Sequence, residues 1–339
     1  MQIDTSAPTR IDLAGGTMDI WPLYLFHSGA QTINAAISLR ATARIDTRDD
    51  NRVVIRSEDT DRTVDVGDWN DLRANGELRL LSLLAHWFLR GPEAPPHGRK
   101  DGLTLTTRCE SPAGAGIAGS SALNVAVCAA LAAWTRHHYE PEALLQIAMN
   151  VEAQAIGVPT GLQDYRPAMY GGIAALELGV NGVHRVPLEV DPRDLESRIV
   201  LCYTGEPRNS GTNNWEITKK HIDGDRRVFD CFERIRDTAG RMREALAGGD
   251  WDGVGSAIAE EWENRKRLAP GVTTPAIEAL VGRAAAAGAT AAKVCGAGGG
   301  GCLFCYGPPA AREAIASALA GGGARVLGFS IERDGLTRG

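Results

Sequence analysis

A stretch rich in glycine and alanine, residues 111–122, constrains the fold of this chain more than any other segment. It reads Ser-Pro-Ala-Gly-Ala-Gly-Ile-Ala-Gly-Ser-Ser-Ala, and apolar residues then recur at the three-and-four spacing of a helix with a buried face. Small residues let the backbone approach an anion, and the N–H groups at a helix start stabilise negative charge. The segment is predicted to be a phosphate-binding loop. A plain turn before a core helix is the alternative.

Length and composition indicate a folded chain of one large or two ordinary domains. It has 339 residues, of which 44% are hydrophobic, and its formal net charge of −6 comes from charges scattered along the chain. This pattern argues against nucleic acid as a partner. No apolar run approaches the roughly 20 residues that span a bilayer, and the N-terminus lacks a signal sequence. We therefore expect a cytoplasmic protein with no membrane partner.

Seven cysteines, an odd number in mostly apolar segments, indicate reduced buried thiols rather than a disulfide framework. Cys302 and Cys305 have the spacing of a redox or zinc pair, but they lie in a short apolar run that is predicted to be a strand. Positions three apart on a strand face opposite sides, so the two thiols should diverge. No second Cys/His pair completes a zinc site.

Hydrophobic periodicity divides the chain near residue 190. The first part mixes predicted strands (41–45, 52–56, 102–107) with predicted helices (78–89, 144–155), which implies a mixed sheet. A polar stretch, residues 187–196, is the expected crossing between domains 1–190 and 191–339. The second part is predicted to contain strands at 199–203, 291–295, 302–306 and 325–331, helices at 228–246, 277–284 and around 315–319, and a polar loop at 208–215. That order predicts a small α+β sandwich.

Three polar side chains can carry phosphoryl transfer if the fold brings them together. Mg²⁺ binds one or two carboxylates, a hydroxyl and phosphate oxygens, which Glu152 and Ser120 can help to supply. Asp164 can then accept the proton of an attacking alcohol. The alternative is that each carboxylate is simply solvated at a helix end.

A second glycine run, residues 296–301, resembles a dinucleotide fingerprint only superficially. That motif needs a helix after it, whereas a predicted strand follows here. Consecutive glycines between strands let the backbone pass close to another loop or to a phosphate. The chain also lacks the GxxxxGK[ST] sequence of P-loop kinases.

Three motifs in order, residues 7–19, 112–122 and 293–302, resemble those of the GHMP kinase superfamily, the group of galactokinase, homoserine kinase and mevalonate kinase. The resemblance covers nearly the full length. It implies an α+β, two-domain fold: an N-terminal mixed-sheet α/β domain, a C-terminal ferredoxin-like α+β sandwich, and an active site between them. It also implies ATP and Mg²⁺ as cofactors.

The resemblance also implies roles for individual residues. Asp164 would be the catalytic base, Arg10 the basic residue near the transferred phosphate, and Ser120 and Glu152 the metal ligands. The nucleotide phosphates would contact Pro112, Gly114, Ala115, Gly116, Ile117, Ala118, Gly119, Ser120 and Ser121. The expected substrate-binding residues are Gly16, Thr17, Asp19, Gly298, Gly299 and, from the polar loop, Asn213.

Within the superfamily, the chain is most similar to sugar kinases that act on heptose 7-phosphate and to fucokinase-like enzymes. It departs from them at Met18, at Gly119 in place of a serine, and at residues 165–167, where Tyr-Arg-Pro replaces Gln-Tyr-Ala. The expected activity is ATP-dependent phosphorylation of a sugar or sugar phosphate at a hydroxyl, the anomeric one, by a monomer or homodimer. The alternatives are an isoprenoid or amino-alcohol kinase and a non-catalytic sugar or ATP sensor.

Overall fold

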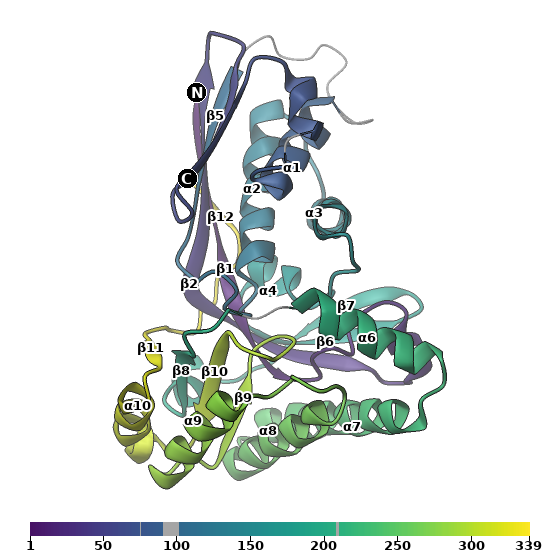
Figure 1. Ribbon diagram of the computed structural model, residues 1–339, viewed down its shortest axis with the longest axis vertical. Coiled ribbons are helices and arrows are strands. Elements are labelled where there is room, and N and C mark those ends of the chain that lie inside the picture. Colours follow the sequence, from purple (N-terminus) through teal and green to yellow (C-terminus); the bar gives the residue numbers. More distant parts are fainter. Residues whose placement is uncertain (75, 91–101, 208–209) are drawn as a thin grey trace.

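The structure is a computed structural model that describes residues 1–74, 76–90, 102–207 and 210–339. It has a tall upper part built on one sheet and a broad lower part built on a second sheet (Figure 1). Helices cover one side of the upper sheet, and the helices of the lower part lie beside and below the second sheet in this view. This is the two-domain α+β architecture that the sequence predicts.

The first sheet is mixed, as expected. Its strands are β1 (Gln2–Ala14), β2 (Gln31–Arg48), β3 (Val53–Ser57), β4 (Arg62–Val66), β5 (Gly102–Cys109), β6 (Ile173–Gly179), β7 (Gly182–Pro187) and β12 (Thr337–Arg338). They run in the order β12-β1-β2-β5-β3-β4, with β6 and β7 continuing from β2. Among the strand pairs of the described residues, only β3 and β5 run parallel. The long β2 pairs with β5 through residues 41–48 and with β6 through residues 31–35.

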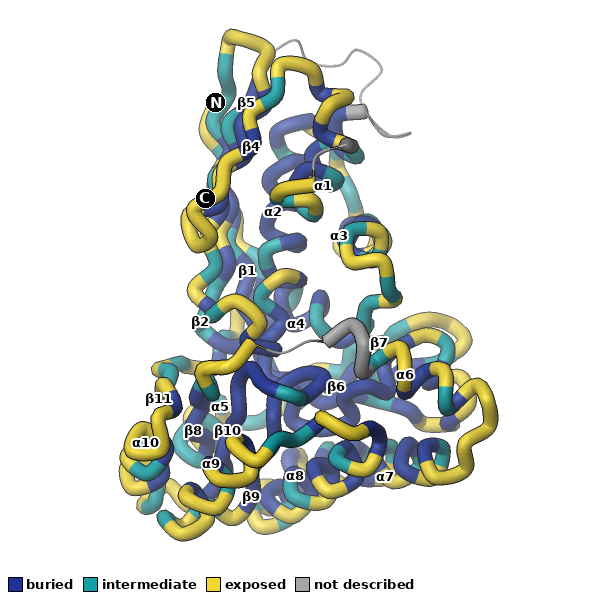
Figure 2. The backbone as a smooth tube through the Cα atoms, viewed as in Figure 1, coloured by how far each residue is buried: buried dark blue, intermediate teal, exposed yellow. Residues whose placement is uncertain are grey.

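Helix α2 (Gly119–Thr135) is the buried support of the upper part. It lies between the sheet and helices α1 (Arg79–Arg90) and α3 (Pro141–Ile156), and Figure 2 shows it almost entirely buried. Val127, Leu131 and Trp134 are completely enclosed in its core. The start of α2 is therefore held in place by packing along the whole helix.

The second sheet is antiparallel, in the order β11-β8-β10-β9. Its strands are β8 (Ile199–Tyr203), β9 (Ala291–Val294), β10 (Cys302–Tyr306) and β11 (Arg325–Leu327). The helices around it are α7 (Arg226–Gly248), α8 (Trp251–Lys266), α9 (Pro275–Ala286) and α10 (Arg312–Gly321). Strand β11 ends at Leu327, so the prediction that this strand extends to residue 331 is wrong. From Gly328 the chain leaves this sheet to reach the first one.

The cysteines of β10 diverge as predicted. Cys305 packs in the core that contains Ile277 of α9 and Leu319 of α10. Cys302 packs in a different core, with Met242 of α7 and Ile258 of α8. Strand alternation separates the thiols, and none of the seven cysteines, all of which lie in described residues, forms a disulfide.

The chain crosses between the sheets near residue 190 and returns at its end. The crossing contains the short helix α5 (Pro192–Glu196), which lies between β7 and β8. Later, Ile331 bridges Ile37 of β2 and β12 pairs with β1. The segment 191–339, expected as the second domain, thus contributes the edge strand of the first sheet, because β1 offers unpaired backbone groups there.

The predicted loop at residues 208–215 is also different in the structure. Helix α6 (Ser210–Ile222) begins at its third residue. Residues 208–209 lie outside the described residues. Two ion pairs at four-residue spacing stabilise this helix, Lys220 with Glu216 and Lys219 with Asp223. Its first turn is polar, so hydrophobic periodicity did not predict it as a helix. The short α-helix α4 (Tyr165–Tyr170) and the 3₁₀ segments η1 (Leu23–Phe26), η2 (Trp69–Ala74) and η3 (Pro309–Ala311) complete the described fold.

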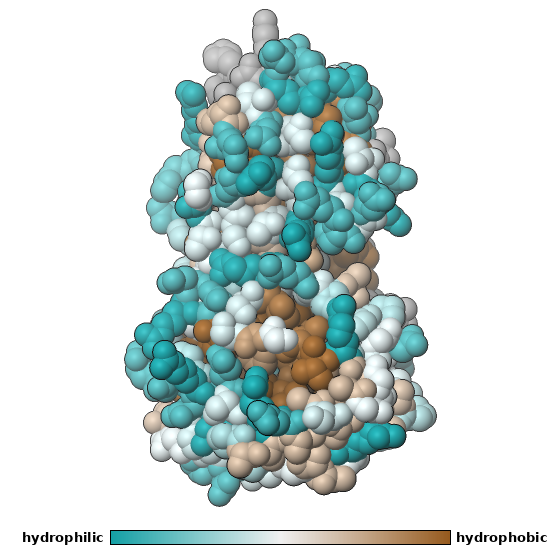
Figure 3. All heavy atoms as spheres, turned by 90° about the vertical axis from the view of Figure 1, so that its left-hand side faces the viewer, coloured by the Kyte–Doolittle hydropathy of each residue, from teal (hydrophilic) through white to brown (hydrophobic). Residues whose placement is uncertain are grey.

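In the part of the chain that the structure describes, helices lie against one face only of the upper part of the first sheet (Figure 1). Figure 3 shows the opposite face as mainly hydrophilic in the upper part, with apolar side chains gathered lower down, where β8, β11 and α10 lie in Figure 1. In the described part of the chain, no helix combines the length and apolar character that a membrane span requires.

Candidate active site

The predicted phosphate loop forms a hollow of about 290 Å³ between β5 and the start of α2. Nine of its lining residues come from residues 111–122: Ser111, Pro112, Ala113, Gly114, Ala115, Gly116, Ala118, Gly119 and Ser120. Ala118, directly before α2, has a left-handed backbone with φ of 62°. Such strain in a non-glycine residue is typical of binding loops. Ile117 instead packs in the core, and Ser121 faces Glu152.

At Gly119 a larger side chain would require the Ser111 hydroxyl to move. A Cβ atom placed there would collide with the Oγ atom of Ser111. Ser111 in turn lies within hydrogen-bond distance of Cys109, with 3.0 Å between Oγ and Sγ.

Glu152 of α3 is buried directly behind Ser120. Its Oε1 atom accepts a hydrogen bond from the Ser120 hydroxyl at 2.9 Å, and its Oε2 atom accepts one from the Tyr165 hydroxyl at 2.6 Å. Burial raises the pKa of Glu152, whereas the hydrogen bonds from Tyr165 and Ser120 lower it. A buried carboxylate beside a hydroxyl is a donor set that fits Mg²⁺.

The rest of such a cation's coordination would come from phosphate oxygens. In the described part of the chain, no group of three or more His, Cys, Asp and Glu side chains could hold a metal ion. Mg²⁺ commonly binds through one or two protein groups plus substrate phosphates and water. Ser120 and Glu152 therefore fit a magnesium ion that arrives with a nucleotide.

Arg10 of β1 connects the phosphate loop with Asp164. Its Nε and Nη2 atoms donate to Oδ1 of Asp164 at 3.0 and 2.5 Å, and its Nη1 atom donates to the carbonyl of Gly116 at 3.0 Å. Burial opposes the charge of Arg10, but the nearby Asp164 and Asp12 raise its pKa overall. Both side-chain bonds go to Oδ1, so Oδ2 of Asp164 takes no part in this ion pair.

Next to this pair lies a small polar pocket of about 50 Å³, here called the acceptor pocket. Its lining residues are Arg10, Thr17, Asp19, Ile20, Gly161, Gln163, Asp164, Asn214, Arg265, Gly296 and Ala297. Two amide oxygens of this lining, Oε1 of Gln163 and Oδ1 of Asn214, are buried without a hydrogen-bond partner. Buried polar atoms are normally paired, so these oxygens are suited to a ligand that donates hydrogen bonds.

Asp19 is the acid of the acceptor pocket whose pKa is shifted by its surroundings. It is 1% exposed, and its Oδ2 atom accepts the backbone N–H of Gln163 at 2.9 Å. Burial, together with the nearby negative charge of Asp164, raises its pKa from 3.8 to about 7. Gly161 is required beside it, because a Cβ atom there would collide with Oδ2 of Asp19.

The second glycine run packs against the phosphate loop. The N–H of Cys302 donates to the carbonyl of Ala115 at 2.6 Å, and a Cβ atom on Gly301 would lie 2.6 Å from that same oxygen. Gly301 has φ of +81°, a conformation that side chains rarely adopt. The two glycine-rich segments, far apart in sequence, therefore form one structural unit.

The structure separates the expected substrate-binding residues. Thr17 and Asp19 line the acceptor pocket. Gly16 instead lies against the carboxylate of Asp12, while Gly298 and Gly299 pack on Val272, whose carbonyl accepts the N–H of Gly299 at 2.8 Å. From the same loop, Gly296 and Ala297 line the pocket. The side chain of Asn213 lies outside the described residues.

Four buried charges lie beside the acceptor pocket and join the two sheets. Lys293 of β9 contacts Asp12 of β1 at 3.4 Å and Glu261 of α8 at 2.5 Å, and Arg265 of α8 contacts Asp12 at 3.0 Å. All four side chains are at most 2% exposed. Despite burial, Lys293 and Arg265 hold the pKa of Asp12 below its usual range. Arg265 also donates to the carbonyl of Gly296 and so connects this cluster to the glycine run.

Sequence reasoning did not single out Tyr165, Gln163, Asn214 or Arg265 as members of this site. Two of them flank Asp164, so proximity to the predicted base was an available signal. Arg265 carried no such signal, because 253 residues separate it from its partner Asp12.

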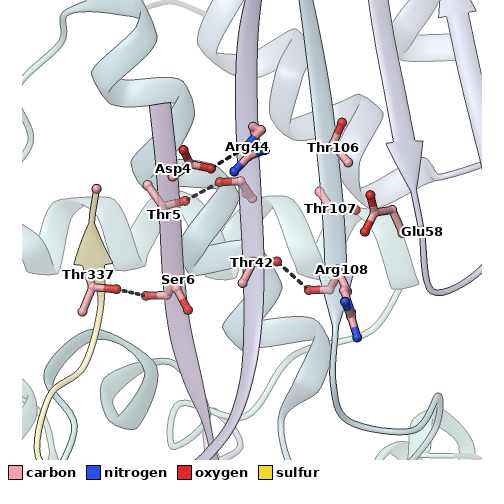
Figure 4. A pocket seen from close by; sticks show the side chains of 12 residues that line it. Asp4, Thr5, Ser6, Thr42, Arg44, Glu58, Thr106, Thr107, Arg108 and Thr337 are labelled. Carbon is pink, nitrogen blue, oxygen red and sulfur yellow. Dashed lines mark hydrogen bonds and ion pairs between the residues drawn. The ribbon is translucent and has the colours of Figure 1, made fainter. Parts of the chain in front are cut away.

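A larger hollow, of about 450 Å³, lies on the open face of the first sheet (Figure 4). It is lined mainly by threonines and charged groups of β1, β2 and β5, among them Thr42, Thr106 and Arg108. Arg44 there is already paired with Asp4 at 2.6 Å. It contains no residue of the phosphate loop, and we do not assign the reaction to it.

Comparisons with known proteins agree with this geometry. Residues 83–172 match the model of the GHMP kinases N terminal domain, and residues 242–325 match the GHMP kinases C terminal model. The D-glycero-alpha-D-manno-heptose 7-phosphate kinase of Campylobacter jejuni is 28% identical over 98% of both chains. A mevalonate kinase of Thermococcus sibiricus is 25% identical over 99% of this chain and 98% of its own.

Solved structures agree as well. The crystal structure of a D-glycero-D-manno-heptose 1-phosphate kinase from Bacteroides thetaiotaomicron aligns with a TM-score of 0.80 and 26% identity. The alignment covers 99% of this chain and 98% of that one. A phosphate loop before a buried helix, a second glycine run against it and both family models lead to one conclusion: the chain belongs to the GHMP kinase family and is a small-molecule kinase.

Proposed function

We propose that the protein is an ATP-dependent sugar kinase that transfers the γ-phosphate to a hydroxyl of a heptose phosphate or a related sugar, the anomeric hydroxyl being the expected acceptor. One observation carries the kinase part of this proposal. Arg10 contacts both the phosphate loop and Asp164, and Asp164 lines the acceptor pocket. A base is thereby held beside the position where a phosphate would lie.

The phosphates of ATP would occupy the hollow formed by residues 112–120. Backbone N–H groups and the start of α2 stabilise their charge there. Ser120 and Glu152 would hold Mg²⁺, which when bound neutralises charge on the phosphates during transfer. Arg10 contacts the carbonyl of Gly116 in this loop and adds a fixed positive charge there.

Asp164 would act as the general base. The Arg10 guanidinium holds Oδ1, and Oδ2 can then receive the proton of the acceptor hydroxyl as its oxygen attacks phosphorus. Because Arg10 is buried and fixed by two partners, this arrangement is organised before substrate binds.

The composition of the acceptor pocket supports a sugar. Asp19, Gln163 and Asn214 present acceptor oxygens, of which two amide oxygens are unpaired. Hydroxyl groups of a sugar donate to such oxygens. The heptose phosphate kinase named above supports the same class of substrate.

The first test is ADP release with Mg·ATP against free hexoses, heptoses, their phosphates, mevalonate and homoserine. We expect turnover on a heptose phosphate or another sugar. Turnover on mevalonate or homoserine alone would move the enzyme to another branch of the family. ATP binding without turnover on any compound would contradict the kinase proposal and favour a sensor.

Replacing Gly301 by alanine is expected to weaken ADP binding by roughly tenfold or more, because the new Cβ atom would press on the carbonyl of Ala115 in the phosphate loop. Gly224→Ala is the matched control. Gly224 has a similar φ of +85° but open space around it, so its variant has the same kind of backbone strain without the contact. Calorimetric titration with ADP compares the two. Equal losses in both variants would contradict contact with the loop as the cause.

Replacing Asp19 by asparagine is expected to stabilise the free protein above neutral pH while weakening acceptor binding. The folded pKa of Asp19 is about 7 and its ordinary value is 3.8. Between these values the folded state holds a proton that the unfolded state has lost, so Asp19 contributes stability at low pH that falls as pH rises to 7. Asparagine does not titrate. The free energy of unfolding of Asp19→Asn, relative to that of the wild type, should therefore rise by about 1–3 kcal/mol between pH 5 and 7.5.

Urea unfolding of both proteins at pH 5 and 7.5 measures this difference. The exposed Asp230 on α7 provides the control, because Asp230→Asn changes the same charge without burial. A wild-type protein as stable as Asp19→Asn at pH 7.5 would show that Asp19 is not strained by burial.

A further inference from the structure

Tyr165 follows the proposed base directly and contacts the proposed metal carboxylate. It is the first residue of α4, its side chain is completely buried, and its hydroxyl donates to Oε2 of Glu152 at 2.6 Å. No step of the proposed reaction uses this tyrosine. The contact is short, enclosed, and made by a residue whose neighbour, Asp164, lines the acceptor pocket.

The donors around Glu152 are distributed unevenly between its two oxygens. Oε2 accepts from Tyr165 at 2.6 Å, from the Ser121 hydroxyl at 3.2 Å and from the Asn124 amide at 3.4 Å. Oε1 accepts from the Ser120 hydroxyl at 2.9 Å. Oε2 is thus surrounded by protein donors, whereas Oε1 is directed at the other proposed metal ligand.

The donors also come from different elements. Ser120, Ser121 and Asn124 all belong to α2, so they fix Glu152 of α3 only relative to that helix. Tyr165 belongs to α4. Its hydroxyl therefore adds a third element to the support, and it is the shortest of the four contacts.

We propose that Tyr165 is a positioning residue: it holds Oε2 of Glu152 so that Oε1 faces the cation site beside Ser120, and thereby ties that site to Asp164 one residue away. This inference rests on the proposed function, because it takes Glu152 as the metal carboxylate. Groups that hydrogen-bond to metal ligands orient them, and their loss commonly costs 10–100-fold in metal affinity.

The test is Mn²⁺ binding to the full-length protein in the presence of ADP, followed by the electron paramagnetic resonance signal of free Mn²⁺. Tyr165→Phe removes the hydroxyl and keeps the ring. We expect it to weaken Mn²⁺ binding by roughly tenfold. The affinity of Tyr165→Phe for ADP without metal should equal that of the wild type. This control shows whether the phosphate loop of the variant is intact. Steady-state kinetics should show a higher Mg²⁺ requirement with a smaller change in kcat.

Tyr170→Phe is the matched control. Tyr170 also lies on α4 and donates to a glutamate of α3, Glu142, at 3.0 Å, but this pair is outside the acceptor pocket and the phosphate loop. Its loss removes the same kind of bond between the same two helices. Mn²⁺ affinity should remain within about twofold of the wild type. Equal weakening in both variants would assign the effect to helix packing and overturn the inference.

Glu152→Gln separates the inference from its premise. If this variant loses Mn²⁺ affinity and Tyr165→Phe does not, the metal assignment stands and the role of Tyr165 is overturned. If Glu152→Gln leaves Mn²⁺ affinity unchanged, the metal assignment in the proposed function fails and the inference fails with it. Loss in Glu152→Gln and Tyr165→Phe, with Tyr170→Phe unaffected, supports both.

Discussion

Replacing Asp164 by asparagine is expected to lower kcat by about 10² to 10⁴, the usual contribution of a general base. Asparagine keeps the size and an oxygen that can accept the bonds from Arg10, so the site should stay assembled. The amide cannot take up the proton of the acceptor hydroxyl. ADP release under saturating acceptor and Mg·ATP measures the loss, and calorimetry should show nucleotide affinity reduced by no more than about twofold.

Asp191→Asn is a suitable control for this experiment. Asp191 precedes the short helix α5 as Asp164 precedes α4, and it is remote from the phosphate loop and acceptor pocket. Asparagine retains the capping oxygen there, so turnover should be unaffected. If Asp164→Asn turned over sugar at near the wild-type rate, another group would have to be the base.

Replacing Lys293 by methionine is expected to destabilise the protein by about 3–5 kcal/mol, the range found when one member of a buried ion pair is removed. Lys293 is completely buried and contacts both Asp12 and Glu261. Without it, Arg265 is left as the cation in direct contact with both enclosed carboxylates, Asp12 and Glu261. Urea unfolding, analysed by linear extrapolation, measures the change.

Two further variants test the cause of this loss. Lys219→Met removes an exposed lysine that pairs with Asp223 on α6 and should change stability by less than about 0.5 kcal/mol. The double variant Lys293→Met/Glu261→Gln restores charge balance in the cluster and should be more stable than Lys293→Met alone. A double variant less stable than the single one would contradict unbalanced charge as the cause.

Much of the fold was predictable because its signals are local. The strand at residues 102–107, the helix behind the phosphate loop and the divergence of Cys302 and Cys305 all follow from side-chain periodicity, which needs no knowledge of distant contacts. The prediction was wrong where tertiary contacts overruled local pattern. Residues 328–331 are apolar enough for a strand, but they leave the second sheet to bridge β2.

The site was predictable only as three separate motifs. The glycine runs stand out in the sequence by their composition, whereas Glu152 and Asp164 gain significance from their combination with the phosphate loop. Their partners do not stand out. Arg265 is one of many arginines, and Gln163 and Asn214 are ordinary polar residues until burial leaves their oxygens unpaired.

The sequence by itself determined the phosphate loop, the order of the elements and the kinase family, because each depends on neighbouring residues and their spacing. Tertiary structure alone decided which charges meet. Arg10 and Asp164 are 154 residues apart, and Asp12 and Arg265 are 253 apart, yet each pair makes a direct contact. Electrostatic pairing and pKa depend on distance and burial in space, and neither quantity is encoded at any fixed spacing along the chain.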